Sequence, residues 1–143
     1  MLYIDYIKKI KKCPFCDEGT RRVLDENEYS YITYALAPYH KYHLLVVPKR
    51  HVENIKDLKW LEQISMTALL SKGIKGLDKL GHNDCSILVR DGIAPHKSLK
   101  HLHYHIIPGG IIEDISEGIQ VRKLLTKKEE NKLIDELNNV AGI

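Results

Sequence analysis

The sequence has few of the features that mark secreted, disulfide-rich or membrane proteins. Its 143 residues include three cysteines, one tryptophan and one phenylalanine. Three cysteines are too few, and odd in number, for a disulfide framework. No apolar run approaches the ~20 residues that a membrane-spanning helix requires. The first twelve residues contain four lysines and lack the apolar stretch of a signal peptide. These absences predict a cytoplasmic protein.

Composition and charge indicate one globular domain that binds small anions. Hydrophobic residues make up 43% of the chain and charged residues 29%, which is ordinary for a soluble domain. A length of 143 residues fits a single domain with its own core. The net charge of +3 suits a site for anionic small molecules better than a surface that coats nucleic acid. We therefore expect a small-molecule partner, no specific nucleic acid and no membrane.

Short β-prone segments predict about five strands. The first two are expected on either side of a turn at Asp25–Asn27, and Pro48 is expected to stop the third. The expected strands cover residues 20–24, 28–34, 42–47, 84–89 and 102–107. No β-α-β rhythm recurs, so the pattern predicts an α+β fold with strands largely in hairpin order.

One long helix is expected between the third and fourth strands, over residues 58–80 with Asp57 as its N-cap. Gly73 and Gly76 weaken its last third and favour an early end. Its apolar residues recur at helical spacing and predict the buried face: Leu58, Leu61, Ile64, Ala68 and Leu69.

Two shorter helices are expected at the ends of the chain. Residues 2–11 have helical apolar spacing. Thr126 followed by Glu129 forms a capping box, which predicts a helix from there to about Asn138.

Three histidines alternate along the last expected strand, at His101, His103 and His105. Successive side chains alternate faces with a rise of ~3.3 Å per residue, so these rings share one face about 6.6 Å apart. As core filling they would be costly, because each ring has polar atoms to satisfy. Two interpretations remain: an open three-histidine metal site, or an imidazole nucleophile at a phosphorus centre. The outer Cα atoms lie ~13 Å apart, which favours nucleophilic catalysis.

The cysteines divide into a pair and a single residue. Cys13-Pro14-Phe15-Cys16 predicts either a metal-binding knuckle or a redox pair. Cys85 begins an apolar run and is expected to be a small core residue.

His101-Leu102-His103-Tyr104-His105-Ile106-Ile107 resembles the His-x-His-x-His-x-x motif of the histidine triad (HIT) superfamily. The resemblance runs from Cys13 to about Gly110 and includes the cysteine knuckle, the segment His43–His51 and Ser98. It implies a single HIT-like domain over residues 1–143, with a core at about 13–110 and a C-terminal extension over 111–143. The implied fold is an antiparallel sheet with the long helix packed across it.

The resemblance also implies an activity and the residues that perform it. His103 matches the nucleophile, which takes a nucleotidyl group from the α-phosphorus of a nucleoside phosphoramidate or dinucleoside polyphosphate. His105 matches the histidine that contacts the phosphoryl oxygens. Ser98 matches a serine at the phosphate or the leaving group, and His43 matches a further pocket histidine, although a strand-end histidine bonded to backbone is an alternative there.

The same comparison implies a structural zinc ion. The matching ligands are Cys13, Cys16, His51 and His101. Two thiolates and two imidazoles make a closed tetrahedral site with no open position for water. We therefore rank zinc above a redox pair at the knuckle.

Several positions depart from the pattern of the family. Arg90 and Lys97 replace an asparagine and a glutamine, and both add positive charge beside the phosphate site. His96 is a further candidate at the pocket entrance, with an exposed loop histidine as the alternative. Ala35 stands where an acidic or amide residue often grips the ribose, which puts that contact in doubt.

We expect a HIT-type nucleotide hydrolase or nucleotidyltransferase, with a slight preference for the diadenosine-polyphosphate enzymes. Family members commonly dimerise, and Trp60 and Met66 on the long helix are candidates for the contact or for core packing. The alternative is a non-catalytic nucleotide-binding or zinc-structured interaction module. Arg90, Lys97 and Ala35 favour that alternative, whereas the complete triad with Ser98 favours catalysis.

Overall fold

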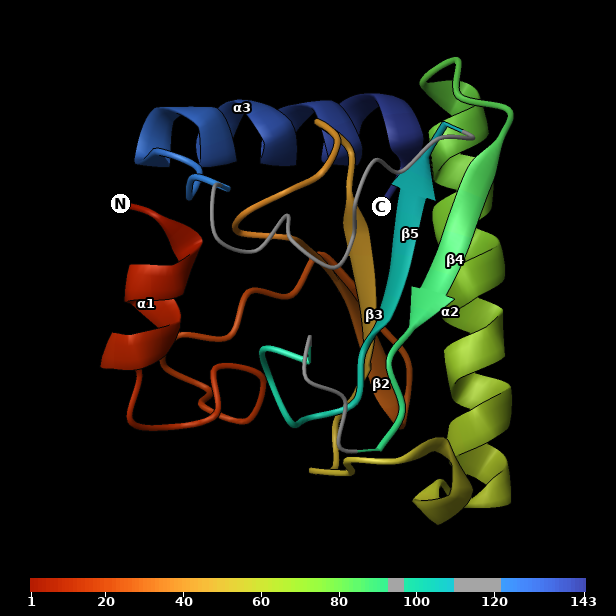
Figure 1. Cartoon of the computed structure of the whole chain (residues 1–143). Coiled ribbons are helices and arrows are strands. Elements are labelled where there is room, and N and C mark those ends of the chain that lie inside the picture. The colour runs from red at the N-terminus through yellow and green to blue at the C-terminus, as the bar shows by residue number, and fades with distance from the viewer. Residues whose placement is uncertain (93–96, 110–121) are drawn as a thin grey trace.

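The described residues, 1–92, 97–109 and 122–143, form an antiparallel sheet of five strands in this computed structural model (Figure 1). The order of the strands across the sheet is β1-β2-β3-β5-β4. Their bounds are β1 Asp25–Glu26, β2 Ser30–Tyr34, β3 Leu44–Pro48, β4 Cys85–Val89 and β5 Tyr104–Pro108. One long helix, α2 (Trp60–Lys79), packs along the sheet. The expected α+β fold, an antiparallel sheet with one long helix packed across it, is confirmed.

The sheet is a middle layer, because side chains on both of its faces are buried. One face packs against α2 and supplies much of the main core, through Ile32, Leu44, Val46 and Ile106. The other face carries a second apolar cluster, formed by Phe15, Tyr31, Ala35, Leu45 and Val47. The alternation of side chains along β2 and β3 produces both clusters from the same two strands. The second face is the one that carries the candidate site.

Helix α2 begins later than the sequence predicts, and Lys59 is its N-cap rather than Asp57. Residues Ile55–Asp57 form a separate 3-10 turn. The Glu62 carboxylate accepts a hydrogen bond from the Lys59 backbone N–H at 2.9 Å, which caps the first turn. Glu62 is itself buried and ion-paired with Arg50 at 2.7 Å. A contact with a residue twelve positions earlier therefore helps to set where the helix starts.

The buried face of α2 differs from the expected apolar stripe. Leu61 and Ile64 are 54% and 49% exposed, and Trp60 is 72% exposed. The buried positions are Glu62, Ser65, Met66, Leu69, Gly73, Gly76 and Leu77. Polar Glu62 and Ser65 take core-facing positions because Arg50 and the hydroxyl of Ser30 satisfy them. Met66 is consequently a core residue.

Gly73 and Gly76 lie within α2 and do not end it. A Cβ atom on Gly73 would lie 2.7 Å from Ile106 Cδ1, and one on Gly76 would lie 2.5 Å from Ile143 Cδ1. The glycines let the helix approach the sheet and the C-terminal segment closely. Packing compensates for their low helix propensity.

The prediction of a first strand over residues 20–24 is wrong. The backbone N–H groups of Thr20 and Arg21 instead bond to the carbonyl of Asp17, which closes a turn. Asp25 and Glu26, expected as turn residues, form β1 and pair with Ile32 and Tyr31.

The turn between β1 and β2 is centred on Asn27. Its side-chain oxygen accepts hydrogen bonds from the Ser30 backbone N–H at 3.0 Å and from the Ser30 hydroxyl at 2.9 Å. The expected turn began at Asp25, and the residue whose side chain stabilises the observed turn lies two positions later.

Two short helices lie near the ends of the chain. Helix α1 (Tyr3–Lys9) and helix α3 (Lys127–Glu136) are found where the sequence predicts them, and Thr126 and Glu129 form the expected capping box. A π-helical turn, η2 (Leu137–Ala141), follows α3 and contacts α2. No helix among the described residues is long and apolar enough to span a bilayer.

Candidate active site

The three triad histidines lie in an extended segment that leads into β5, and only His105 lies within that strand. The ladder between β3 and β5 pairs Val46 with Tyr104. Continuing this register would place Leu102 opposite Pro48, which has no N–H to donate. The Leu102 N–H donates to the Val52 carbonyl at 2.6 Å instead. The expected start of the strand at Leu102 is therefore wrong.

His103 is held in one tautomer by the backbone. Its Nδ1 lies 2.8 Å from the carbonyl oxygen of His101, which can only accept a hydrogen bond. The proton is therefore on Nδ1, and Nε2 keeps its lone pair. Burial, together with the charges of Lys97 and Arg90, lowers the pKa of His103 to about 4. At neutral pH the ring is neutral, although it still borders the cavity.

A chain of hydrogen bonds orients His105. The Tyr39 backbone N–H donates to His43 Nδ1 at 3.2 Å, so the proton of neutral His43 is on Nε2. That Nε2–H donates to His105 Nδ1 at 2.8 Å, which leaves the His105 proton on Nε2. Burial lowers the pKa of His43 to about 3 and that of His105 well below its usual value. His103 thus offers a lone pair, and His105 beside it offers an N–H donor.

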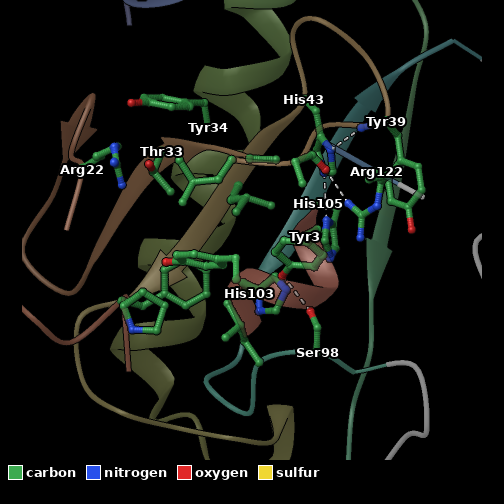
Figure 2. A pocket seen from close by; sticks show the side chains of 18 of the residues that line it. Tyr3, Arg22, Thr33, Tyr34, Tyr39, His43, Ser98, His103, His105 and Arg122 are labelled. Carbon is green, nitrogen blue, oxygen red and sulfur yellow. Dashed lines mark hydrogen bonds between the residues drawn. The ribbon is translucent and has the colours of Figure 1, made fainter. Parts of the chain in front are cut away.

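One cavity on the sheet face opposite α2 brings these groups together (Figure 2). His43, Ser98, His103, His105, Arg90 and Lys97 all line it. The expected residue His96 lies outside the described residues. Ala35 also lines the cavity, and its methyl group belongs to the apolar cluster around Phe15. It has no polar side chain to offer a ribose.

Tyr3 and Arg122 line this cavity and were not predicted from the sequence. The Tyr3 hydroxyl lies 2.8 Å from Ser98 Oγ. The Arg122 guanidinium carbon lies 4.8 Å from the ring centroid of Tyr3 and 4.1 Å from that of Tyr39. A tyrosine in a short terminal helix and an arginine beyond the motif region carry no local pattern that would have identified them.

The ligand atoms of Cys13, Cys16, His51 and His101 lie within 4.8 Å of one another, so these residues could hold a metal ion. Both cysteine Sγ atoms lie close to His101 Nδ1, at 3.4 and 3.3 Å, and Cys16 Sγ lies 3.3 Å from His51 Nδ1. Such separations suit two sulfur and two nitrogen ligands around one tetrahedral ion.

The second nitrogen of each of these imidazoles supports the same arrangement. His101 Nε2 lies 2.8 Å from the carbonyl oxygen of Pro48, and His51 Nε2 lies 3.4 Å from the Glu53 carboxylate. Donation from Nε2 leaves the lone pair on Nδ1, toward the cysteines. The donor set fits a metal ion.

Phe15 connects this cluster to the triad. Its ring centroid lies 5.6 Å from that of His101 and 5.2 Å from that of His103. The Phe15 carbonyl oxygen accepts a hydrogen bond from the Tyr31 hydroxyl at 2.9 Å. An ordered knuckle therefore holds one wall of the cavity.

The HIT domain family model matches residues 17–110. The chain belongs to the HIT domain family. The matched residues of this HIT protein include the triad, His43 and Ser98, whereas Cys13, Cys16, Tyr3 and Arg122 lie outside the match.

Curated relatives of the HIT protein include named enzymes. It is 31% identical over 100 residues to an uncharacterized HIT-like protein of Methanocaldococcus jannaschii, covering 67% of this chain and 78% of that protein. It is 33% identical over 90 residues to the bis(5′-nucleosyl)-tetraphosphatase (asymmetrical) of Schizosaccharomyces pombe, covering 62% and 49%. It is 32% identical over 73 residues to the adenosine 5′-monophosphoramidase of the same yeast, covering 51% and 53%. The matches span about half the length of the two yeast enzymes.

Solved structures share the fold of the HIT protein. A hypothetical histidine triad nucleotide-binding protein from Sulfolobus tokodaii aligns with a TM-score of 0.73 and 24% identity, covering 91% of this chain and 92% of that one. A Zn-bound histidine triad family protein from Mycobacterium smegmatis aligns with a TM-score of 0.67 and 21% identity, covering 92% and 96%.

Proposed function

We propose that this HIT protein is a nucleotide hydrolase or nucleotidyltransferase that forms a covalent nucleotidyl-histidine on His103. One observation carries the proposal: the His101 carbonyl holds the proton of His103 on Nδ1, so Nε2 is available as a nucleophile. The named activities of the yeast relatives, a nucleosyl-tetraphosphatase and a monophosphoramidase, support the same reaction class.

The proposed first step is in-line displacement at the α-phosphorus. His103 Nε2 forms a bond to phosphorus as the bond from phosphorus to the leaving oxygen or nitrogen breaks. The Nε2–H of His105 donates to a non-bridging phosphoryl oxygen and stabilises the charge that develops there. The Ser98 hydroxyl, oriented by Tyr3, donates to the leaving atom. Water or another acceptor then attacks the same phosphorus and releases His103.

The apolar end of the cavity is the proposed nucleoside site. Phe15, Tyr31 and Leu45 form the cluster there, and Thr33 lies on the same face of β2. An aromatic and aliphatic lining suits a base, because stacking does not depend on its hydrogen-bonding edge. Since Ala35 has no polar side chain, we expect a weaker ribose contact than an acidic or amide residue would provide.

Zinc is the proposed metal at Cys13, Cys16, His51 and His101. The two-sulfur, two-nitrogen donor set is typical of structural zinc sites. When bound, the ion would supply a structural cross-link between the knuckle and the segment before His103. The chemistry at phosphorus remains with the side chains of the cavity.

A homodimer is the proposed assembly, with the exposed apolar side chains of α2 at the contact. Trp60, Leu61 and Ile64 are 72%, 54% and 49% exposed. Exposed apolar side chains gathered on one helix favour a protein interface over plain solvation. Met66, the other expected contact residue, is 1% exposed and belongs to the core.

Intact-mass spectrometry tests the proposed reaction. The protein would be mixed briefly with an AMP phosphoramidate or with diadenosine tetraphosphate and quenched without acid, which preserves a phosphorus–nitrogen bond. We expect an adenylyl adduct on the wild type and on His82→Gln, a matched histidine outside the cavity, but not on His103→Ala. Binding of both compounds without adduct or product would favour the non-catalytic nucleotide-binding module, to which Ala35 also points.

A further inference from the structure

The N-terminal residues pair with the segment Arg122–Leu124, which precedes α3, beside the triad. The Tyr3 N–H donates to the Arg122 carbonyl at 2.8 Å, and Leu2 and Lys123 form an antiparallel bridge. The Leu124 N–H donates to the Met1 carbonyl at 3.1 Å. This pairing places one side chain from each segment, those of Tyr3 and Arg122, in the wall of the cavity.

The Arg122 guanidinium is held in place on several sides. It lies over the rings of Tyr3 and Tyr39, at 4.8 and 4.1 Å from their centroids. Its Nη1 donates to the Ala37 carbonyl. Aromatic stacking fixes the plane of a guanidinium and makes it ready to bind an anion with little further ordering. Burial lowers the pKa of Arg122, but an arginine remains charged at neutral pH.

The position of Arg122 relates it to one part of a bound substrate. Figure 2 shows Ser98 and Arg122 on one side of His103, and Arg22, Thr33 and Tyr34 on the other. The charge of Arg122 contributes to the lowered pKa values of His43 and His105, which places it within electrostatic reach of His105, the proposed donor to the phosphoryl oxygen. It therefore lies at the end of the cavity away from the apolar nucleoside site.

The charge of the cavity is one-sided. Its described lining residues include the cations Arg22, Arg90, Lys97 and Arg122 and no aspartate or glutamate, although Arg22 is ion-paired with Glu130 behind the wall at 2.8 Å. A low-dielectric cavity lined by one sign of charge concentrates ligands of the opposite sign. A neutral amine leaving group would gain nothing from a cation at Arg122, whereas a departing phosphate or carboxylate would be stabilised.

We propose that Arg122, held by Tyr3 and Tyr39, forms a leaving-group subsite that selects substrates whose leaving group is an anion. This inference rests on the proposed nucleotidyl transfer and adds a specificity-determining residue to it. In the reaction, the bond from the α-phosphorus to the leaving oxygen breaks as the bond to His103 Nε2 forms. The electron pair stays on the leaving oxygen, and the Arg122 guanidinium binds the anion that results. Phosphate and carboxylate leaving groups share this chemistry.

The test compares leaving groups on a common adenylyl donor. Diadenosine tetraphosphate releases a polyphosphate, acetyl adenylate releases a carboxylate, and an AMP N-alkyl phosphoramidate releases a neutral amine. For Arg122→Gln we expect kcat/KM to fall about 10-fold to 100-fold with diadenosine tetraphosphate, as for a lost hydrogen bond to a charged group. The amine-releasing donor should change less than about threefold. With acetyl adenylate, a similar fall in kcat/KM would indicate a subsite for anions in general, and an unchanged kcat/KM would indicate a subsite that requires phosphate.

Two further variants make the comparison specific. Lys123→Gln removes an exposed positive charge one residue away and should leave kcat/KM unchanged with every donor. Arg122→Lys keeps the positive charge but loses the planar guanidinium, so its fall in kcat/KM with diadenosine tetraphosphate should be smaller than that of Arg122→Gln. This variant replaces Arg122→Gln in the test if Arg122→Gln does not fold. An equal fall with all three donors in a folded Arg122 variant would overturn the proposal, because Arg122 would then act through the histidines or the fold.

Affinity separates this inference from the proposed function. If the wild type turns over none of the donors, nucleotidyl transfer fails and the subsite is tested by calorimetry with adenosine 5′-tetraphosphate and AMP. The wild type should then prefer the tetraphosphate, and Arg122→Gln should lose most of that preference. Equal preference in the two proteins would overturn the subsite.

Discussion

His103 Nδ1 lies 2.8 Å from the carbonyl oxygen of His101, two residues earlier in the chain. The same stretch of backbone carries both the proposed nucleophile and one of the four candidate metal ligands. A peptide carbonyl keeps its acceptor character across the whole working pH range, unlike a carboxylate. The tautomer of His103 is therefore set by the backbone path, and anything that moves His101 should change the reactivity of His103.

Replacing the proposed nucleophile should separate chemistry from binding. We expect His103→Ala to lower kcat by at least about a thousandfold with any adenylyl donor. Its affinity for AMP should stay within a few-fold of the wild type, because the apolar nucleoside site is intact. Rapid-quench kinetics and calorimetry would measure the two quantities. Turnover by His103→Ala at a rate close to that of the wild type would refute covalent catalysis at this residue.

Acid should destabilise the protein partly through His43. Its pKa is about 3 in the folded chain against an ordinary value of 6.5 for histidine, so the unfolded chain binds the proton first as pH falls. The contribution of His43 to the free energy of unfolding is therefore fully present above about pH 6.5 and is lost as the pH falls toward 3. At pH 5 the loss for His43 alone is about 2 kcal/mol. Urea unfolding at pH 7 and pH 5 would measure it.

The matched variant for that experiment is His43→Gln, whose amide can still donate to His105 Nδ1. It should be less stable at pH 7 but should lose less stability between pH 7 and pH 5 than the wild type. An identical pH dependence in the two proteins would show that His43 is not the group responsible.

The metal cluster predicts a specific effect of single cysteine changes. Protein purified without chelator should contain about one zinc per chain, and Cys13→Ser or Cys16→Ser should lose most of it, because each removes one of four ligands. Cys85→Ser is the control, since Cys85 packs against the main core and lies outside the cluster. Elemental analysis measures the metal content. Full zinc occupancy in Cys13→Ser would contradict the site.

The exposed apolar face of α2 predicts the assembly state. Trp60→Glu combined with Ile64→Glu should convert a dimer into a monomer, because the charges would be buried unpaired at the contact. Val140→Glu changes another exposed apolar residue, 52% exposed, and should leave the dimer intact. Sedimentation velocity would distinguish the species. A wild type that is monomeric at high concentration, or an equal effect of Val140→Glu, would argue against this interface.

Local sequence patterns predicted the elements whose contacts are local. The capping box of Thr126 and Glu129 satisfies backbone groups within one helical turn, and α3 begins where it predicts. Helix α2 behaves differently, because Glu62 is buried against Arg50 and caps the first turn. A polar residue at a core position breaks the apolar stripe, so the expected face of Leu61 and Ile64 is exposed.

By itself, the sequence determined the fold class and the triad, because these depend on residue types at fixed spacings. The four candidate metal ligands came from the resemblance to the HIT superfamily that the triad and the cysteine pair carry. Only the tertiary structure decided which nitrogen of each histidine carries the proton, since that depends on carbonyl and imidazole partners such as Pro48 and His43. It alone brought Arg122 into the cavity beside Tyr3, across more than a hundred residues of chain. The physical reason is the pairing of residues 1–3 with residues 122–124, a long-range contact that leaves no periodic pattern in either segment.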